Sequence, residues 1–199
     1  MVHLTEDEVD DLIYFARANE ADDLASTLAE LVAKAGAADP AATPLAVLAA
    51  AVDAGKNTTL HMAAGNGHEA IVRLIVTQIK DAPKEARQAF LDATNAFGNT
   101  ALHWAAMNGH LAVVKLLVDE AGASPALAND KNYVALDLAG LNDKVAVVDY
   151  FLASAEKAEK AAEASSSQAN GGLSDAVAGV DLKAEEEEED VVVLSAKRE

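Results

Sequence analysis

A block of eleven residues that occurs twice restricts the fold of this chain more than any other feature of its sequence. Residues 58–68 read TTLHMAAGNGH and residues 100–110 read TALHWAAMNGH, so the two blocks share most of their residues. Each block is followed by apolar residues at helical spacing, which are Ile71, Val72, Leu74 and Ile75 in the first and Val113, Val114, Leu116 and Leu117 in the second. A pattern of this kind predicts stacked units of helix, tight turn and helix.

Two weaker copies flank this central pair. The later copy begins at Val134, 34 residues after Thr100, and carries the apolar residues Val147, Val148, Tyr150 and Phe151. The earlier copy has residues 12–19 as its first helix and Leu24, Leu28 and Leu31 as the apolar face of its second. The last copy has Val134 and Asp137 where the central copies have Thr and His. Such divergence is expected at the ends of an array, because a terminal repeat must present a polar outer face.

These residues resemble the ankyrin repeat, a unit with a Thr-Pro-Leu-His start, a Gly-His turn and a Val-Val-x-Leu-Leu second helix. The resemblance runs from Val9 to about Leu152. It implies an all-α ankyrin-repeat solenoid of four helix–turn–helix repeats with insertions between repeats, followed by a disordered acidic C-terminal tail. The implied ankyrin-repeat domain is 1–164, with repeats at approximately 8–36, 53–80, 95–128 and 129–153 and a helical extension to 164, and the tail is 165–199.

The repeats are unevenly spaced because two insertions separate them. The Asn residues at 19, 66, 108 and 142 mark the same position in each repeat, and they lie 47, 42 and 34 residues apart. The extra length falls within 35–56 and within 81–94. Pro44 and Pro83 each precede a stretch of helical character, so each insertion is predicted to contain a short helix. Insertions in a repeat array collect at one edge, and we expect these two to shape the binding edge.

The chain is strongly acidic, with 33 Asp and Glu against 15 Lys and Arg and a formal net charge of -18. Residues 1–152 alone hold 21 acidic and 10 basic side chains, a net charge of -11, so the repeats themselves are acidic. This charge repels phosphate backbones and argues against direct binding to nucleic acid. No stretch approaches the ~18 apolar residues of a membrane span, and the absence of Cys suits a reducing compartment. We expect a cytoplasmic and nuclear monomer that binds no membrane.

The tail has the composition of a disordered segment. Residues 165–172 read SSSQANGG, and residues 185–190 form the like-charge block EEEEED. Neither segment can bury enough apolar surface to fold on itself. One interpretation of the tail is an accessory that keeps a basic client soluble. The alternative is that Val191–Leu194 adds as a short strand to the sheet edge of a partner.

Four histidines at matching positions, His61, His68, His103 and His110, raise the question of a metal site. Neither pair has the i, i+4 spacing of a helical zinc site, and no thiolate is available. In ankyrin repeats the equivalent histidines cap helices and join adjacent repeats through hydrogen bonds, which is the role expected here. The sequence also lacks a Gly-x-Ser-x-Gly elbow and a Walker loop. We expect no catalytic residue, no cofactor and no metal. The alternative to a binding protein is an enzyme or the regulatory subunit of one.

The ankyrin resemblance also locates candidate residues for binding a partner. The recurring Asn suits the left-handed end of each first helix and, in the family, faces the concave groove. Large side chains fall on the loops between repeats and at inner helix ends, where they form either a strip for a partner helix or ordinary packing. Trp104 is expected to be mainly core, with one edge in the groove. The predicted partner-binding residues are Asp53, Asn57, Asn66, Phe97, Asn99, Trp104, Met107, Asn108, Asp130, Tyr133, Leu141 and Asn142.

An acidic groove with apolar anchors is suited to a basic amphipathic segment. Long-range attraction would speed the encounter, and the apolar anchors would provide most of the residence time. Basic, aggregation-prone proteins of this kind include histones and ribosomal proteins. From charge and shape the chain is therefore a chaperone or an adaptor for such a client.

One further resemblance narrows the client. The order of the repeats, the insertions, residues 99–120 and the acidic tail resemble the fungal family of ribosome-assembly chaperones typified by Yar-one. That family implies a dedicated chaperone of the small-subunit ribosomal protein S-three, which binds the client's basic N-terminal helix in the ankyrin groove and keeps it soluble before assembly into pre-ribosomes. The alternative is a regulatory ankyrin adaptor or an inhibitor of a basic nuclear protein such as a transcription factor.

Overall fold

The computed structural model describes residues 2–38 and 42–169 of the chain. It divides into a compact unit, Met1–Ala155, and a second unit, Glu156–Glu199. The predictions made for the tail beyond residue 169, including those for Val191–Leu194, lie outside the described residues. The domain boundary predicted at 164 stays a prediction.

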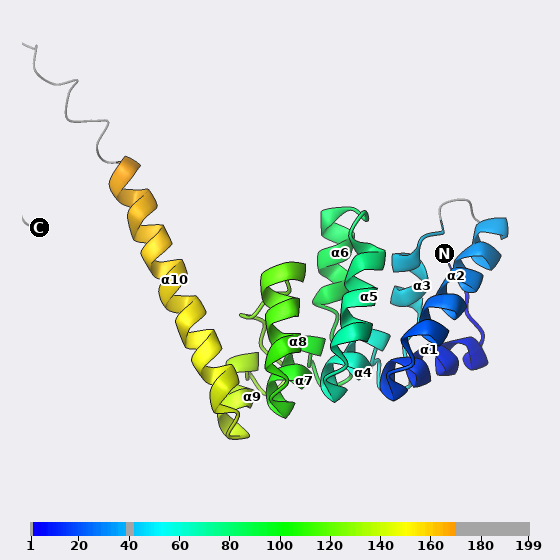
Figure 1. Ribbon diagram of the computed structural model, residues 1–199, viewed down its shortest axis with the longest axis horizontal. Helices are drawn as coiled ribbons and strands as arrows, with labels where there is room; N and C mark the ends of the chain where they lie inside the picture. The colour runs from blue at the N-terminus through cyan, green and yellow to red at the C-terminus, as the bar shows by residue number, and fades with distance from the viewer. Residues whose placement is uncertain (1, 39–41, 170–199) are drawn as a thin grey trace, which may run out of the picture. The chain divides into compact units, whose positions relative to one another are not determined.

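Four pairs of helices form the repeats, and the all-α solenoid predicted from the sequence is confirmed (Figure 1). The first helices of the pairs, here called the inner helices, are α1 Glu6–Ala18, α4 Thr59–Asn66, α7 Ala101–Asn108 and α9 Ala135–Leu141. The second helices, called the outer helices, are α2 Ala21–Ala38, α5 Glu69–Ile79, α8 Leu111–Lys115 continued by the π-helical turn η1 Leu116–Ala121, and α10 Val145–Ala169. The two predicted insertion helices are also present, as α3 Pro44–Ala50 and α6 Lys84–Leu91.

The repeated Thr and Gly residues set where the inner helices begin and end. Thr58 and Thr100 have extended backbones, and their side chains accept hydrogen bonds from the backbone N–H of the histidine three residues later. These contacts satisfy N–H groups that the first helical turn leaves unpaired. At the other end Gly67 and Gly109 take the left-handed conformation, with φ of 76° and 84°, as the Asn-Gly sequences predicted.

The first and last repeats start and end their inner helices with other residues. At the start of α1, Thr5 accepts a hydrogen bond from the Glu8 N–H at 3.3 Å, and the Glu8 carboxylate accepts one from the Thr5 N–H at 2.8 Å. In the last repeat the Asp137 carboxylate accepts from the Val134 N–H at 3.0 Å, so Asp replaces the missing Thr-His pair. The helix end there is made by Asn142 and by a left-handed Asp143, with φ of 58°.

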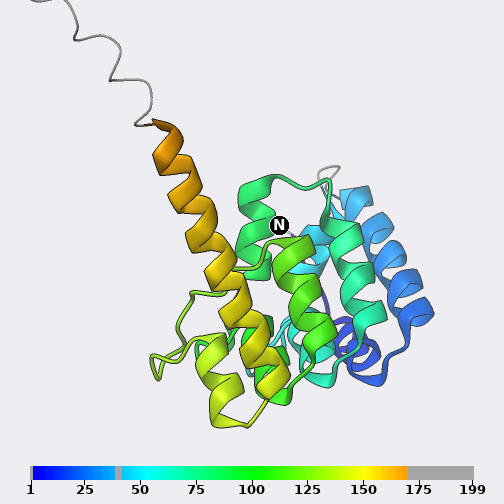
Figure 2. The ribbon, with the colours of Figure 1, turned by 60° about the vertical axis from the view of Figure 1, so that its left-hand side comes forward.

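Helices of successive repeats lie against one another in two rows (Figures 1 and 2). In the inner row α1 packs on α4, α4 on α7 and α7 on α9, while α2, α5 and the α8–η1 segment follow one another in the outer row. The buried apolar residues of all four repeats form one continuous core. The apolar faces predicted for the outer helices are in this core: Leu24, Leu28, Ile71, Val72, Ile75, Val113, Val114, Leu116, Leu117, Val147 and Phe151.

A large residue of one repeat packs on a glycine of the repeat before it. A Cβ on Gly65 of α4 would lie 2.5 Å from Cε3 of Trp104 in α7. The missing side chain of Gly65 is therefore the space that the indole ring of Trp104 fills. The ring also meets His61 edge-on, with centroids 6.2 Å apart, so most of the indole belongs to the core between the two repeats.

Two features at the C-terminal end of the repeats extend the sequence-based predictions. The Tyr150 hydroxyl of α10 donates a hydrogen bond to the Asp119 carboxylate of η1 at 2.7 Å and joins the last two outer helices. Burial, with this carboxylate, raises the pKa of Tyr150 to about 12, so the hydroxyl keeps its proton. Helix α10 continues to Ala169, beyond the predicted end at 164, and Lys160 pairs with Glu156 one turn away. Within residues 2–38 and 42–169, no helix has the length and apolar character needed to cross a membrane.

Replacing Gly65 by Ala should lower the free energy of unfolding by about 1–3 kcal/mol, because the added methyl group would overlap the Trp104 ring. The matched control is Gly140→Ala in α9, where an added Cβ meets no atom within 4 Å. There the helix propensity of Ala should raise the free energy of unfolding by about 0.5–1 kcal/mol. Urea denaturation measures both changes. Equal effects of the two substitutions would show that Trp104 does not depend on a bare Gly65.

Candidate partner-binding face

Three loops with one conformation precede the inner helices α4, α7 and α9. We call residues 52–58 finger 1, residues 94–100 finger 2 and residues 128–134 finger 3. The side-chain Oδ1 of one residue in each finger accepts hydrogen bonds from the backbone N–H groups two and four residues later. These three residues are Asp53, Asn95 and Asn129. Each finger is thus closed by its own carboxylate or amide, which sets the direction in which its outer side chains point.

Each finger is also bonded to the next. The Asn95 amide donates to Oδ1 of Asn57 at 2.9 Å, and the Asn129 amide donates to Oδ1 of Asn99 at 2.7 Å. The backbone repeats the link, because the N–H of Ala96 donates to the carbonyl of Gly55 at 2.8 Å. The fingers therefore form one hydrogen-bonded ladder.

Two of the inner helices, α4 and α7, are each joined to the next finger by one buried histidine. The Thr58 N–H donates to Nδ1 of His61 at 3.2 Å, so Nδ1 is unprotonated and the ring carries its proton on Nε2. That Nε2–H donates to the carbonyl of Asn99 in finger 2 at 2.9 Å. His103 repeats the arrangement with Thr100 and donates to the carbonyl of Tyr133 in finger 3 at 3.0 Å. Burial lowers the pKa of both histidines, which keeps the neutral rings in these roles.

The second pair of histidines joins the repeats at the other end of the inner helices. His110 donates from Nε2 to the carbonyl of Gly65 at 3.0 Å, and the amide of Asn108 donates to the same carbonyl at 2.6 Å. His68 reaches back in the same way to the carbonyl of Arg17 at 2.8 Å. The prediction that the repeated histidines join repeats is confirmed for all four, and the predicted helix capping is confirmed for His61 and His103. Among the described residues, no group of three or more His, Cys, Asp or Glu side chains is placed to hold a metal ion.

The large side chains predicted to bind a partner lie on the fingers and along the inner helices, and we call this surface the finger–helix face. Phe97 at the tip of finger 2 is 69% exposed, Leu141 at the end of α9 is 63% exposed, and Tyr133 in finger 3 is 38% exposed. Trp104 and Met107 on α7 are half-buried. Exposure of these residues favours the apolar strip over ordinary packing for Phe97, Tyr133 and Leu141. Trp104 is partly buried against the core, with its ring next to Gly65 and His61.

All but one of the polar residues predicted to bind a partner have a structural side-chain hydrogen bond in the part of the chain that the structure describes, and the exception is Asp130. Asp53, Asn57 and Asn99 hold the fingers, and Asn108 joins α7 to α4. The amides of Asn66 and Asn142 donate to the carbonyl one turn earlier in their own helices, both at 2.8 Å. Asp130 is exposed beside Gly98, with no such bond from its carboxylate among the described residues. Partner contact by all of these residues stays a prediction, and Asp130 is the one whose side chain is free to make it.

Sequence reasoning missed Asn95 and Asn129, which hold the finger ladder together. Their signal was present, because Asp53, Asn95 and Asn129 each stand five residues before the start position of a repeat. Those start positions are Thr58, Thr100 and Val134. An acid or amide recurring at one offset indicates a shared turn, and a search for Asx residues at a fixed distance would have found it.

The finger–helix face combines an apolar strip with charges of both signs. Asp130 and Lys131 are exposed on finger 3, and Lys56 is exposed on finger 1. The wider field is acidic, because residues 1–152 carry 21 acidic and 10 basic side chains. The exposed Asp22 and Asp23 at the start of α2 contribute to it. Such a surface can attract a basic segment from a distance and hold it through apolar anchors.

Comparison with known proteins gives a family and a structural neighbour. The family profile described as ankyrin repeats (3 copies) matches residues 12–127 and 60–163. Among solved structures, the crystal structure of the yeast ribosomal protein Rps3 in complex with its chaperone Yar1 is similar, with a TM-score of 0.68 and 36% sequence identity. The match covers 76% of this chain and 95% of that chain. No curated protein sequence matches the chain.

The buried histidines predict a specific pH dependence of stability. Because burial lowers the pKa of His61 and His103 below the ordinary 6.5, the unfolded chain takes up protons first as the pH falls. The free energy of unfolding should therefore be fully retained above about pH 6.5 and decline below it, by up to about 1.4 kcal/mol per pH unit for each histidine. Urea denaturation between pH 7.5 and 5.5 measures the slope.

The double variant His61→Gln, His103→Gln should be less stable at pH 7.5 and should show a shallower slope over the same range. NMR titration of the ring protons gives an independent reading. Titration of both rings at or above pH 6.5 would contradict the assignment of neutral, buried imidazoles.

Proposed function

The chain belongs to the ankyrin-repeat family, and from this membership and the finger–helix face we propose that it is a dedicated chaperone of a small-subunit ribosomal protein. One observation carries the proposal. The likeness to the yeast complex of Rps3 and its chaperone has 36% sequence identity and covers 95% of the matching chain. The client proposed for this chain is therefore the equivalent of Rps3.

The rigidity of the finger–helix face supports a role in binding a partner. The finger ladder and the histidine bonds hold the fingers in fixed relative positions before a client arrives. A pre-organised surface loses little conformational entropy on binding, so more of the contact energy appears as affinity. We place the client's basic N-terminal helix on this face, with its apolar side against Phe97, Tyr133 and Leu141.

Charge and apolar contact have different parts in this proposal. Exposed ion pairs contribute only about 0.2–1 kcal/mol each, so acidity alone would not hold the client. The acidic field instead raises the association rate and lowers the net charge of the complex. Occupying the client's basic helix keeps it from other polyanions, and the client stays soluble until it is delivered to pre-ribosomes.

The remaining parts of the proposal concern state and place. We propose that the chain acts as a monomer, because the finger–helix face must be free to receive the client. We also propose that it acts in both the cytoplasm, where ribosomal proteins are made, and the nucleus, where pre-ribosomes assemble. The proposal requires no catalytic residue, cofactor or metal.

Binding of full-length Rps3 and of its isolated N-terminal helix should be saturable at near-physiological salt. Phe97→Ala and Tyr133→Ala should each weaken binding by about 1–3 kcal/mol, or roughly 5- to 150-fold in Kd, because each removes an exposed anchor. Leu152→Ala, which truncates a 52% exposed residue on the outer helix α10, is the matched control and should change Kd by less than about twofold. Stopped-flow measurements should show an association rate that falls as salt rises.

The outcomes separate the parts of the proposal. Absence of saturable binding to full-length Rps3 would overturn the chaperone function. Binding of the whole protein without binding of the helix would overturn the choice of segment. Undiminished binding by the triple variant Phe97→Ala, Met107→Ala, Tyr133→Ala would move the client to another surface.

A further inference from the structure

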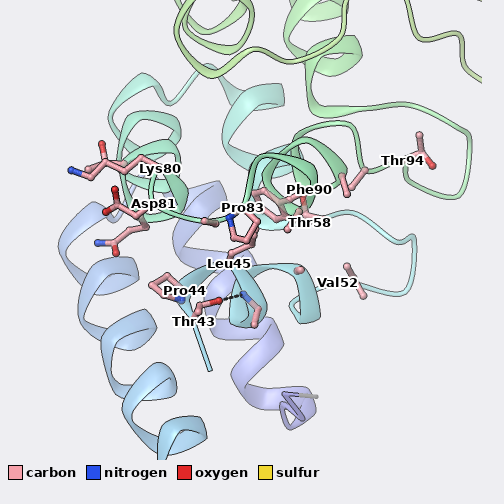
Figure 3. A pocket seen from close by; sticks show the side chains of 18 of the residues that line it. Thr43, Pro44, Leu45, Val52, Thr58, Lys80, Asp81, Pro83, Phe90 and Thr94 are labelled. Atoms are coloured by element: carbon pink, nitrogen blue, oxygen red, sulfur yellow. Dashed lines mark hydrogen bonds between the residues drawn. The ribbon is translucent and has the colours of Figure 1, made fainter. Parts of the chain in front are cut away.

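A second groove lies between the two insertion helices, α3 and α6, apart from the exposed anchors of the finger–helix face. It has a volume of about 1270 Å³. Figure 3 shows Pro44 and Leu45 of α3 on one side and Pro83 and Phe90 of the α6 segment on the other. The end of α5 and the base of finger 1 close the groove, and Lys56 at its edge belongs to that finger. Its largely apolar lining between two helices suits a helical segment of chain as the occupant.

The walls of the groove are made of small side chains on two helices. On each helix two alanines one turn apart face the groove, and these are Ala46 and Ala49 on α3 and Ala86 and Ala89 on α6. Ala49, Ala86 and Ala89 are exposed, while Leu45 and Phe90 below them are buried. Small side chains let the backbone of a third helix approach closely, and the buried pair gives the groove an apolar floor.

The apolar surface continues beyond this groove toward the first repeat. A smaller hollow of about 310 Å³ between α2 and α3 shares Pro44 and Gln78 with it. The hollow is lined on the α2 side by Ala25, Leu28, Ala29, Val32 and Ala33. Together the two hollows give an elongated apolar track, which suits a helical segment better than a single anchored side chain.

The rim of the groove carries the opposite charge to the rest of the repeats. Lys56, Lys80 and Asp81 are the charged residues that line it. Helix α6 also carries Lys84, Glu85 and Arg87, so residues 80–87 together with Lys56 hold four basic and two acidic side chains. The repeats as a whole have 10 basic and 21 acidic side chains over residues 1–152.

The basic side chains of the rim are available to a partner. Lys56, Lys80 and Lys84 are exposed. None of these three takes part in an ion pair among the described residues. Arg87 is half-buried and donates from Nη1 to the carbonyl of Lys80 at 2.8 Å, which fixes the turn between α5 and α6 that carries the lysines.

We propose that this groove docks an acidic amphipathic helix of a second protein. Its apolar face would lie on the alanine walls over Leu45 and Phe90, and its acidic flanks would meet Lys56, Lys80 and Lys84. Charge selects this occupant over a basic one, because a basic helix would meet like charge at the rim. The chain therefore has two docking surfaces of opposite charge preference, and they meet at finger 1, where Val52, Lys56 and Thr58 line the groove.

The probe is a fluorescent synthetic helix with Leu and Ala on one face and Glu on its flanks, titrated with the full chain and read by fluorescence anisotropy. The matched probe has Lys in place of every Glu. The Glu-flanked helix should bind at least about tenfold more tightly than the Lys-flanked one. Equal binding of the two helices, or saturable binding of neither, would overturn the proposal.

Two kinds of variant locate the binding. The charge variant Lys80→Glu, Lys84→Glu and the wall variant Ala89→Gln should each weaken binding of the Glu-flanked helix by about tenfold or more. All three positions are exposed, so the fold should persist, which the melting transition checks. The control Lys131→Glu reverses one positive charge on finger 3, and Phe97→Ala removes an anchor of the client face. Both should leave this affinity unchanged, and a loss equal to that of the groove variants would overturn the placement.

Discussion

The hydrogen bond from a buried histidine to the next finger is the interaction on which the other features of the repeats depend. His61 and His103 each receive the N–H of their capping Thr on Nδ1 and donate from Nε2 to a carbonyl 38 or 30 residues later. One side chain thus starts a helix, orients a loop and joins two repeats. Because each ring must be neutral and in a single tautomer, its burial is part of the function of the bond.

The finger–helix face follows from this constraint. Once the histidines hold the finger carbonyls, the Asx residues can close each finger and bond it to its neighbour. Phe97 and Tyr133 then stand on loops with little freedom left to lose. The insertion helices lie outside this ladder, and they were free to form a groove whose rim charge differs from that of the repeats.

The sequence predicted the features that recur and missed those that depend on distant partners. Repetition of Thr-x-x-His and Asn-Gly located the helices, the ankyrin resemblance implied the roles of the histidines, and Pro44 and Pro83 marked the insertion helices. The fixed offset of Asn95 and Asn129 indicates a shared turn, but their bonds cross between repeats to residues 38 and 30 positions away, and a local pattern does not identify those partners. The groove was missed because it depends on two insertions meeting in space. Helix α10 continues to Ala169, past the predicted end at residue 164, where a run of serines had suggested a linker.

The packing of Trp104 on Gly65 restricts which repeat can follow the second one in the chain. The residue of the third repeat that corresponds to Gly65 is Met107, which carries a side chain where Gly65 has none. If a duplication placed another copy of the third repeat directly behind the existing one, the tryptophan of the new copy would face this methionine. The second and third repeats are therefore not equivalent modules at this joint. The shape complementarity that closes one joint also gives each repeat a unique place in the chain.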